Sequence, residues 1–319
     1  MNTIPSTFNG HQIDRTVLGG MQPSPDSKLP VSVIMLNYGG SHLRVQTIEN
    51  LLGCGFRSVV WIEPTPDSFN IEDISRRYPS VKFVIPLEKA TDGELINACV
   101  SEIDSEYFLV LRDTLRIPQG ILLQNLAENL TKDKKYCIVP RLINADGQGI
   151  SVTVLPEAKK GRFLLTPSQF VSDGLPTLYP PDFIGLYNRE KFIQLGGYDY
   201  TITAPYWQNA DLSLRAWLWG EKIALSTSFL ISYEQEKTVE DTTRNYSYIR
   251  FYLKNILPSF KDDHGVIKPM TFFNFKVHSS CGFFESLSLF KSAQKWVEMN
   301  KYRFKMDVQQ LIENWVSGK

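Results

Sequence analysis

The chain has few of the residues that build disulfide frameworks or bind soft metal ions. Its 319 residues include only four cysteines and four histidines. The cysteines are far apart and form no Cys-X-X-Cys pair, so we expect free thiols in a reducing compartment.

Lys and Arg total 34, as do Asp and Glu, and the formal net charge is therefore zero. This balance offers no basic face, so we do not expect nucleic acid among the partners.

Long apolar runs are also absent. No stretch approaches the ~18 apolar residues needed to span a bilayer, and the amino terminus lacks a basic segment followed by an apolar one. Hydrophobic residues still make up 43% of the chain, which is enough for a sizeable core. We therefore expect a cytoplasmic protein with at most peripheral membrane contact.

The patterning divides the chain into three regions. Residues 1–29 are rich in glycine and proline without a sustained period, which predicts a flexible tail that is partly disordered or draped on the body. Residues 30–237 alternate short apolar runs (31–36, 58–62, 81–85 and 107–111) with helical patterns. This alternation predicts an α/β fold with a mixed, mostly parallel sheet and helices on both faces. Residues 238–319 show helical spacing and predict a helical C-terminal extension.

Several local signals refine this outline. Thr91 and Glu94 have capping-box spacing, which predicts a helix that begins after Thr91. The turn residues 144–147 predict a hairpin between strands near 138–139 and 151–155, and residues 156–181 read as loop. Asn188 and Asp211 each precede a helical pattern, and we expect each to cap its helix.

Two stretches together resemble a known family. The first is Val31-Ser-Val-Ile-Met-Leu-Asn-Tyr38, and the second is Leu195-Gly-Gly-Tyr-Asp199 with the segment 211–220. They resemble the start and the acceptor-side end of family-2-type inverting glycosyltransferases with the GT-A fold. The resemblance implies transfer of a sugar from a nucleotide-sugar to a glycan, lipid-linked or protein acceptor, in surface polysaccharide or glycoconjugate synthesis.

In such folds the nucleotide lies across the carboxyl ends of the parallel strands. The resemblance implies that Asn37 and Tyr38 line the base and ribose and that Glu63 binds the base. It also places Asp92 and Asn97 beside the ribose and sugar. The alternative for Glu63 and Asp92 is that both are solvated loop acids.

The family's metal-binding Asp-X-Asp motif is altered in this chain. The corresponding tripeptide is Arg112-Asp113-Thr114, which leaves Asp113 as the candidate ligand for Mn²⁺ or Mg²⁺. A hard divalent cation requires several oxygen ligands, and a neighbouring arginine disfavours it. Arg112 either binds the diphosphate directly, with Lys89 as a second candidate cation, or pairs with Asp113 or a surface acid.

The catalytic-base position is altered as well. The family usually carries Glu-Asp where this chain has Gln208 and Asn209, and an amide cannot accept a proton at neutral pH. No histidine lies near Tyr233 and Glu234, where the family often completes its metal site. We expect the four histidines to be surface or packed residues: His11, His42, His264 and His278.

Two hypotheses about function therefore remain. One is a transferase that works without the usual metal site, and the other is a catalytically inactive GT-A module that binds or scaffolds a partner. The aromatic residues of the C-terminal helices are expected to pack against the body, or, if exposed, to contact a protein partner or a membrane surface. Both hypotheses require the segments around residues 113 and 209 to meet at one site.

Overall fold

A nine-stranded mixed sheet forms the centre of the molecule. The computed structural model describes residues 11–22, 27–37, 44–64, 70–159, 162–234, 239–279 and 281–315. Within these residues the strand order is β1-β4-β3-β2-β5-β10-β7-β11-β6. Strands β2, β3, β4, β5, β7 and β11 run in one direction, and β1, β6 and β10 oppose them. The expected mixed, mostly parallel sheet is thus confirmed. The strands are β1 (Arg15–Gly19), β2 (Val31–Leu36), β3 (Val59–Ile62), β4 (Val81–Pro86), β5 (Tyr107–Arg112), β6 (Leu115–Arg116), β7 (Cys137–Ile143), β10 (Gly185–Asn188) and β11 (Ile223–Tyr233).

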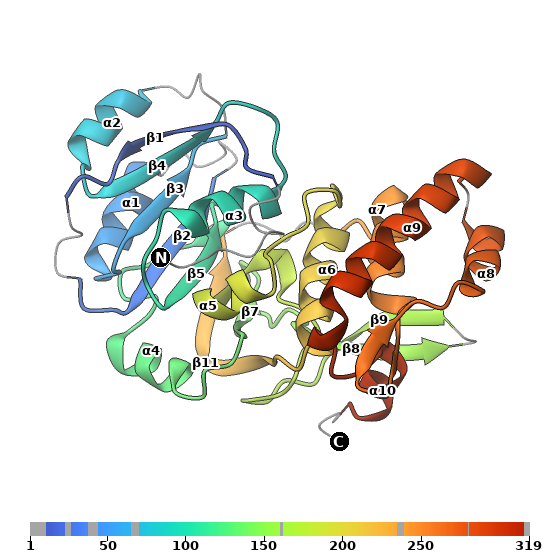
Figure 1. Ribbon diagram of the computed structural model, residues 1–319. Coiled ribbons are helices and arrows are strands. Elements are labelled where there is room, and N and C mark those ends of the chain that lie inside the picture. Colours follow the sequence, from blue (N-terminus) through green and yellow to red (C-terminus); the bar gives the residue numbers. More distant parts are fainter. Residues whose placement is uncertain are drawn as a thin grey trace.

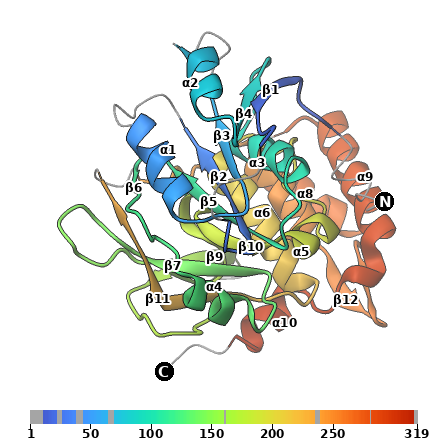
Figure 2. The same ribbon diagram turned by 90° about the vertical axis from the view of Figure 1, so that its left-hand side faces the viewer.

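Helices cover both faces of this sheet. Helices α1 (Arg44–Gly53) and α2 (Ile71–Arg77) lie on one face, and α3 (Asp92–Ser101) and α6 (Pro205–Leu218) lie on the other (Figures 1 and 2). All six residues of β2 are buried, as expected for a parallel strand enclosed between two helical layers. The capping box predicted at Thr91 and Glu94 is present at the start of α3, and the Asn188 side chain caps α5 (Arg189–Gln194).

Two expectations about the irregular regions hold only in part. Within the segment expected to be flexible or draped on the body, β1 pairs antiparallel with β4 at the sheet edge. The turn at 144–147 reverses the chain, with an antiparallel bridge between Ile143 and Gly149, but the strand expected at 151–155 has another partner. Strand β8 (Thr153–Lys159) pairs with β9 (Arg162–Ser168), inside the segment that reads as loop. Partners in a sheet are set by long-range packing, which a local turn signal does not report.

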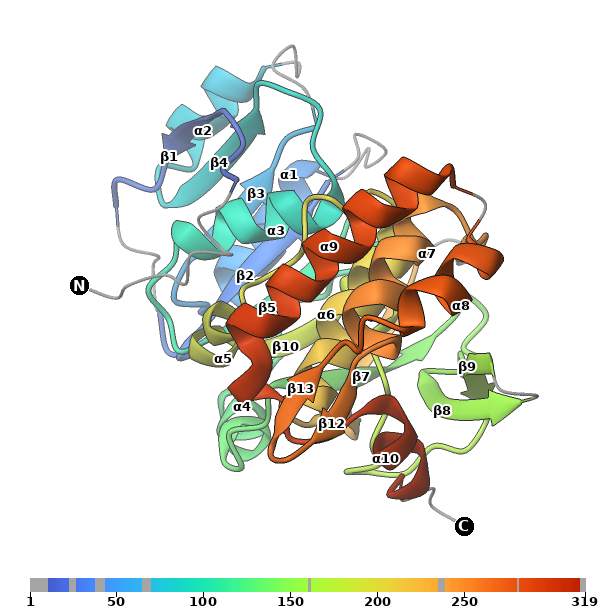
Figure 3. The ribbon, with the colours of Figure 1, turned by 45° about the vertical axis from the view of Figure 1, so that its right-hand side comes forward.

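The C-terminal residues form helices around α6. They are α7 (Tyr246–Phe251), a π-helical turn η2 (Tyr252–Ile256), α8 (Thr271–His278), α9 (Phe283–Asn300), the short helix η3 (Lys301–Arg303) and α10 (Val308–Glu313), with a hairpin of β12 (Ser259–Lys261) and β13 (His264–Val266). Figure 3 shows α9 lying along α6 and α7. The remaining elements are α4 (Gln124–Thr131) and the short helix η1 (Pro181–Phe183).

The described residues form two hydrophobic clusters, and α6 contributes to both. The first surrounds the large sheet, and the second lies between the outer side of α6 and the C-terminal helices. Phe251, Phe272 and Phe275 are buried in the second cluster, whereas Phe273 and Phe284 are exposed. Among the described helices, none combines the length and apolar character needed to cross a bilayer.

Candidate functional site

The predicted site residues follow adjacent strands at one edge of the sheet. In the register of β2, Leu36 is opposite both Ile62 of β3 and Arg112 of β5. The residues that come next, Asn37, Glu63 and Asp113, are therefore neighbours at the carboxyl ends of these strands. The backbone N–H of Asp113 donates to the Leu36 carbonyl at 3.0 Å, which holds the end of β5 against β2. Tyr38 lies outside the described residues.

Glu63 is not the solvated loop acid of the alternative interpretation. Its side chain is 1% exposed, and Nη1 of Arg44 donates to its two carboxylate oxygens at 3.0 and 3.1 Å. A buried carboxylate requires such a cation, because burial without a partner is costly. Arg44 is a residue that the sequence analysis missed. No motif identifies it, since the contact joins the start of α1 to the end of β3.

Arg112 contacts the first turn of α3 and the segment before β10. Its Nη2 lies 3.5 Å from an Asp92 carboxylate oxygen, and its Nη1 donates to the Asp182 carbonyl at 3.5 Å. Arg112 therefore pairs with Asp92, a buried acid of the predicted site that the alternative interpretation did not name. Lys89 is exposed on the loop before α3.

Asp182 is a second residue that the sequence analysis missed. Its carboxylate accepts a hydrogen bond from the Tyr233 hydroxyl, and its backbone N–H is 3.5 Å from Oε1 of Glu240. Burial, followed by the charge of Asp182, raises the pKa of Tyr233, so this tyrosine is a neutral donor. Asp182 and Phe183 both have left-handed backbone conformations, with φ of 52° and 64°. Such strain in consecutive non-glycine residues is typical of functional sites.

The residues at this site do not fit a divalent cation. Across the described part of the chain, no three His, Cys, Asp or Glu side chains are grouped so that they could hold a metal ion. Asp113 is the one acid of its tripeptide, and its neighbour Arg112 brings a positive charge. Tyr233 uses its hydroxyl to bind Asp182. We therefore derive no step that uses a metal ion.

Gln208 joins the base position to α3. The backbone N–H of Gly93 donates to its Oε1 at 3.0 Å, and its Nε2 donates to Thr91 Oγ1 at 2.9 Å and to the Asp199 carbonyl at 3.0 Å. The side chain is fully buried. Because it donates and accepts at the same time, an amide satisfies this position and a carboxylate would not.

Asn209 makes a comparable contact. Its Nδ2 donates to the Pro180 carbonyl at 2.6 Å, and the residue is 1% exposed. An ionised aspartate at this position would bring its negative charge against that carbonyl oxygen. Neither amide is therefore available as a general base.

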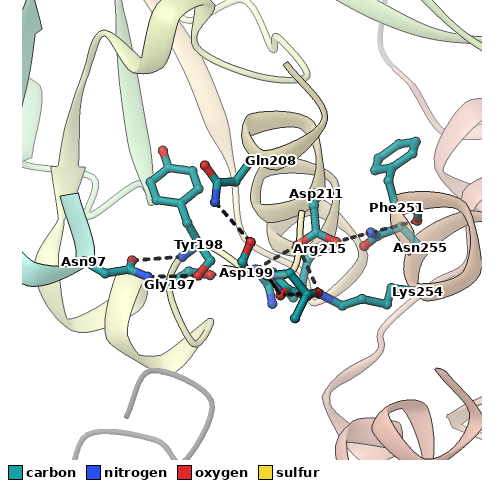
Figure 4. Close-up of polar contacts among 11 residues, drawn as sticks. Asn97, Gly197, Tyr198, Asp199, Gln208, Asp211, Arg215, Phe251, Lys254 and Asn255 are labelled. Carbon is teal, nitrogen blue, oxygen red and sulfur yellow. Dashed lines mark hydrogen bonds and ion pairs between the residues drawn. The ribbon is translucent and has the colours of Figure 1, made fainter. Parts of the chain in front are cut away.

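The segments around residues 113 and 209 meet, as the resemblance requires. Arg112 and Gln208 contact consecutive residues of α3, Asp92 and Gly93. Arg112 and Asn209 also both bind the segment 180–182. Asn97, one turn further along α3, uses its side chain to bind the backbone N–H and carbonyl of Tyr198 at 3.0 and 2.9 Å (Figure 4).

Asp211 does not cap a helix, contrary to expectation. It lies inside α6, because the helix begins at Pro205, and it is fully buried. Its carboxylate accepts from Asn255 Nδ2 at 2.7 Å and lies 3.2 Å from both Lys254 Nζ and Arg215 Nη2 (Figure 4). Lys254 and Asn255 come from η2, so this acid anchors the C-terminal extension to α6.

Of the described histidines, His11 lies beside the first turn of α3, and His264 lies in the C-terminal extension. His11 is 3.1 Å from Glu94 and stacks on Tyr200, and His264 binds the Asp262 carbonyl in the β12–β13 turn. His42 and the side chain of His278 lie outside the described residues.

The architecture is similar to that of known solved structures. GalNAc-T7, solved with UDP, GalNAc and Mn²⁺, superimposes with a TM-score of 0.53 at 12% identity over 86% of this chain and 58% of that chain. TarS of S. aureus superimposes with a TM-score of 0.50 at 11% identity over 90% of this chain and 46% of that chain. The chain therefore spans roughly half the length of these two proteins. No protein-family model and no curated protein matches the sequence. Together with the sheet topology, these similarities show that the chain has the GT-A-like fold of the glycosyltransferases.

Proposed function

We propose that the protein is a glycosyltransferase-like protein that binds a nucleotide-sugar at the strand-end site. It transfers the sugar to a glycan, lipid-linked or protein acceptor, in surface polysaccharide or glycoconjugate synthesis. The observation that carries the proposal is the placement of Arg112 at the end of β5, next to Asp92 and the segment 180–182. In a GT-A-like fold this is where the donor diphosphate binds.

In this scheme a guanidinium replaces the metal ion. Arg112 forms paired hydrogen bonds to the phosphate oxygens and offsets the charge on the leaving nucleoside diphosphate. The geometry supports this role because Asp92 already holds the guanidinium at the strand end. Binding of the nucleotide is therefore expected to be independent of Mn²⁺ and Mg²⁺.

Transfer also requires a base for the attacking hydroxyl. Gln208 and Asn209 cannot take the proton, so we assign this role to Asp182. It is a carboxylate on the segment that contacts both Arg112 and Asn209. As the bond from the sugar to the diphosphate breaks, the acceptor oxygen bonds to the sugar and its proton passes to Asp182.

A second candidate function is a non-catalytic GT-A module that binds a partner or a glycan. The observation that favours it is the hydrogen bonding of Gln208 and Asn209, in which both amides donate to main-chain carbonyls. These contacts fix amides where an inverting transferase would carry its acids. The module would keep the fold without the reaction.

The test is calorimetric titration with UDP, GDP and their sugars, each with and without Mn²⁺, followed by an assay for released nucleoside diphosphate. We expect metal-independent binding that falls about tenfold or more in Arg112→Gln. Arg116, an exposed arginine on β6, the next strand in the sequence, provides the matched control, and Arg116→Gln should bind as the wild type does.

Turnover that is lost in Asp182→Asn, with binding retained, would support the transferase. Binding without turnover would favour the non-catalytic module. Turnover that requires Mn²⁺ would contradict the role given to Arg112, and a complete absence of nucleotide binding would contradict the transferase.

A further inference from the structure

A separate cavity lies on the C-terminal side of the molecule, between the loop after α5 and helices η2 and α9. Its volume is about 370 Å³, which is within the range of small-molecule sites. Leu253, Leu289, Ala293 and Trp296 supply apolar lining, and Asp199, Lys254 and Arg215 lie along one wall. Asp199 lines the cavity, and its backbone carbonyl accepts a hydrogen bond from Gln208 (Figure 4).

The charges along that wall neutralise one another. Lys254 Nζ lies 2.7 Å from Asp199 and 3.2 Å from Asp211, and Arg215 lies 3.2 Å from Asp211. Two cations thus face two carboxylates in a closed network. Lys254 also lies over the Trp296 ring, 4.7 Å from its centroid. Lys254 and Arg215 are therefore both paired within the protein.

Arg250 differs from the other cations that line the cavity because it forms no ion pair among the described residues. Its Nε is buried without a hydrogen-bond partner among the described residues, and the contact that the structure gives its guanidinium is the Tyr246 ring, 5.1 Å away. A buried polar group that lacks a partner is costly. The cavity therefore carries one uncompensated positive charge beside an apolar lining.

We propose that this cavity binds a small amphipathic anion. Its acidic group, a carboxylate or a phosphate, pairs with the Arg250 guanidinium, which matches both groups with two parallel hydrogen bonds. Its apolar body packs on Leu253, Leu289 and Trp296. A fully polar ligand fits less well, because the apolar lining requires a hydrocarbon group beside the acidic one.

Calorimetric titration of the full chain tests this site with hexanoate, hexyl phosphate, inorganic phosphate and the uncharged 1-hexanol. Hexanoate or hexyl phosphate should bind more tightly than inorganic phosphate and hexanol, by about tenfold or more. The comparison of hexanoate with hexyl phosphate then separates a carboxylate ligand from a phosphate ligand. Equal affinity for hexanol and the anions, or no binding of either anion, would overturn the proposal.

Two variants locate the site. Arg250→Met keeps the side-chain length and removes the charge, so anion binding should fall about tenfold or more. Arg244→Met is the matched control, because Arg244 also lies over a tyrosine ring, that of Tyr248 at 4.9 Å, but does not line the cavity.

A substitution at the exposed rim, Ser292→Trp, should block binding without a change in thermal stability. Anion binding that is unchanged in both Arg250→Met and Ser292→Trp would refute the site. Nucleotide titration of Arg250→Met should match the wild type, so this result is independent of the proposed function.

Discussion

The backbone N–H of Gly93 donates to Oε1 of Gln208 at 3.0 Å, which joins the first turn of α3 to α6 across 115 residues of sequence. The two helices come this close because residue 93 has no side chain. The position expected to hold a catalytic base is therefore part of the packing between two helices, and this contact determines which substitutions the site tolerates.

Gly93→Ala is expected to destabilise the protein. An added Cβ would lie 2.5 Å from Tyr198 Cβ and 2.6 Å from Gln208 Cδ, well inside contact distance. We expect a loss of roughly 1–3 kcal/mol in the free energy of unfolding, because a packed interior accommodates an extra methyl group poorly. Urea denaturation measures the change. Gly53→Ala is the control: its Cβ would meet neighbouring atoms at 3.5 Å or more, so the substitution should not lower the midpoint.

Gln208→Glu, which introduces the family's acid, should also destabilise the fold and should not create turnover. The carboxylate would lose the two hydrogen bonds that Nε2 donates and would face the Asp199 carbonyl, at a cost of about 1–3 kcal/mol. The exposed Gln148→Glu serves as the matched control.

The pH dependence of that variant provides a further check. Burial beside the Asp199 carbonyl, with the Gly93 N–H as its donor, would raise the pKa of the introduced carboxyl, so its protonated form, which can donate, becomes favoured as the pH falls. The deficit in unfolding free energy relative to the wild type should therefore shrink towards acid pH. A constant deficit from neutral pH down to about pH 4, near the ordinary pKa of glutamate, would contradict this explanation.

Lys254→Met should loosen the C-terminal extension from α6. The substitution leaves Asp211, which is fully buried, without one of its two cationic partners and removes the partner of Asp199. Breaking a buried ion pair by removal of one partner costs about 3–5 kcal/mol. Thermal unfolding and proteolysis after residue 238 would both report the loss. Lys301 pairs with the exposed Glu298, so Lys301→Met is the control and should unfold as the wild type does.

Asp199 is expected to make stability fall in acid. Burial opposes its ionisation, but the charge and hydrogen bond of Lys254 and the hydrogen bonds from Thr201 outweigh burial and hold its pKa well below the usual range. A carboxyl with a lowered folded-state pKa contributes stability above its ordinary pKa of about 3.9 and loses that contribution as the pH falls through the folded-state value. Wild-type and Asp199→Asn proteins should thus differ most in unfolding free energy at neutral pH and converge below about pH 4. A difference that is independent of pH would show that the charge of Asp199 contributes nothing.

The elements of the first half of the sheet could be predicted from local sequence. Continuous apolar runs predicted β2, β3, β4 and β5, because strands that are buried on both faces consist of such runs. The caps at Thr91 and Asn188 were equally local, since a capping side chain binds a backbone group within three residues. Because Glu63, Asp92 and Arg112 follow or end successive strands in the sequence, their position at one edge of the sheet could also be predicted.

Tertiary structure alone decided how these residues are used. Arg44, Asp182 and Lys254 reach their partners across distances in sequence that no periodicity encodes, so neither the Glu63 ion pair nor the buried role of Asp211 was foreseen. The sequence determined that amides stand at positions 208 and 209. Only the packing of α6 against α3 and the segment 180–182 decided that those amides serve as hydrogen-bond donors, because a side chain's function depends on which backbone groups the fold places opposite it.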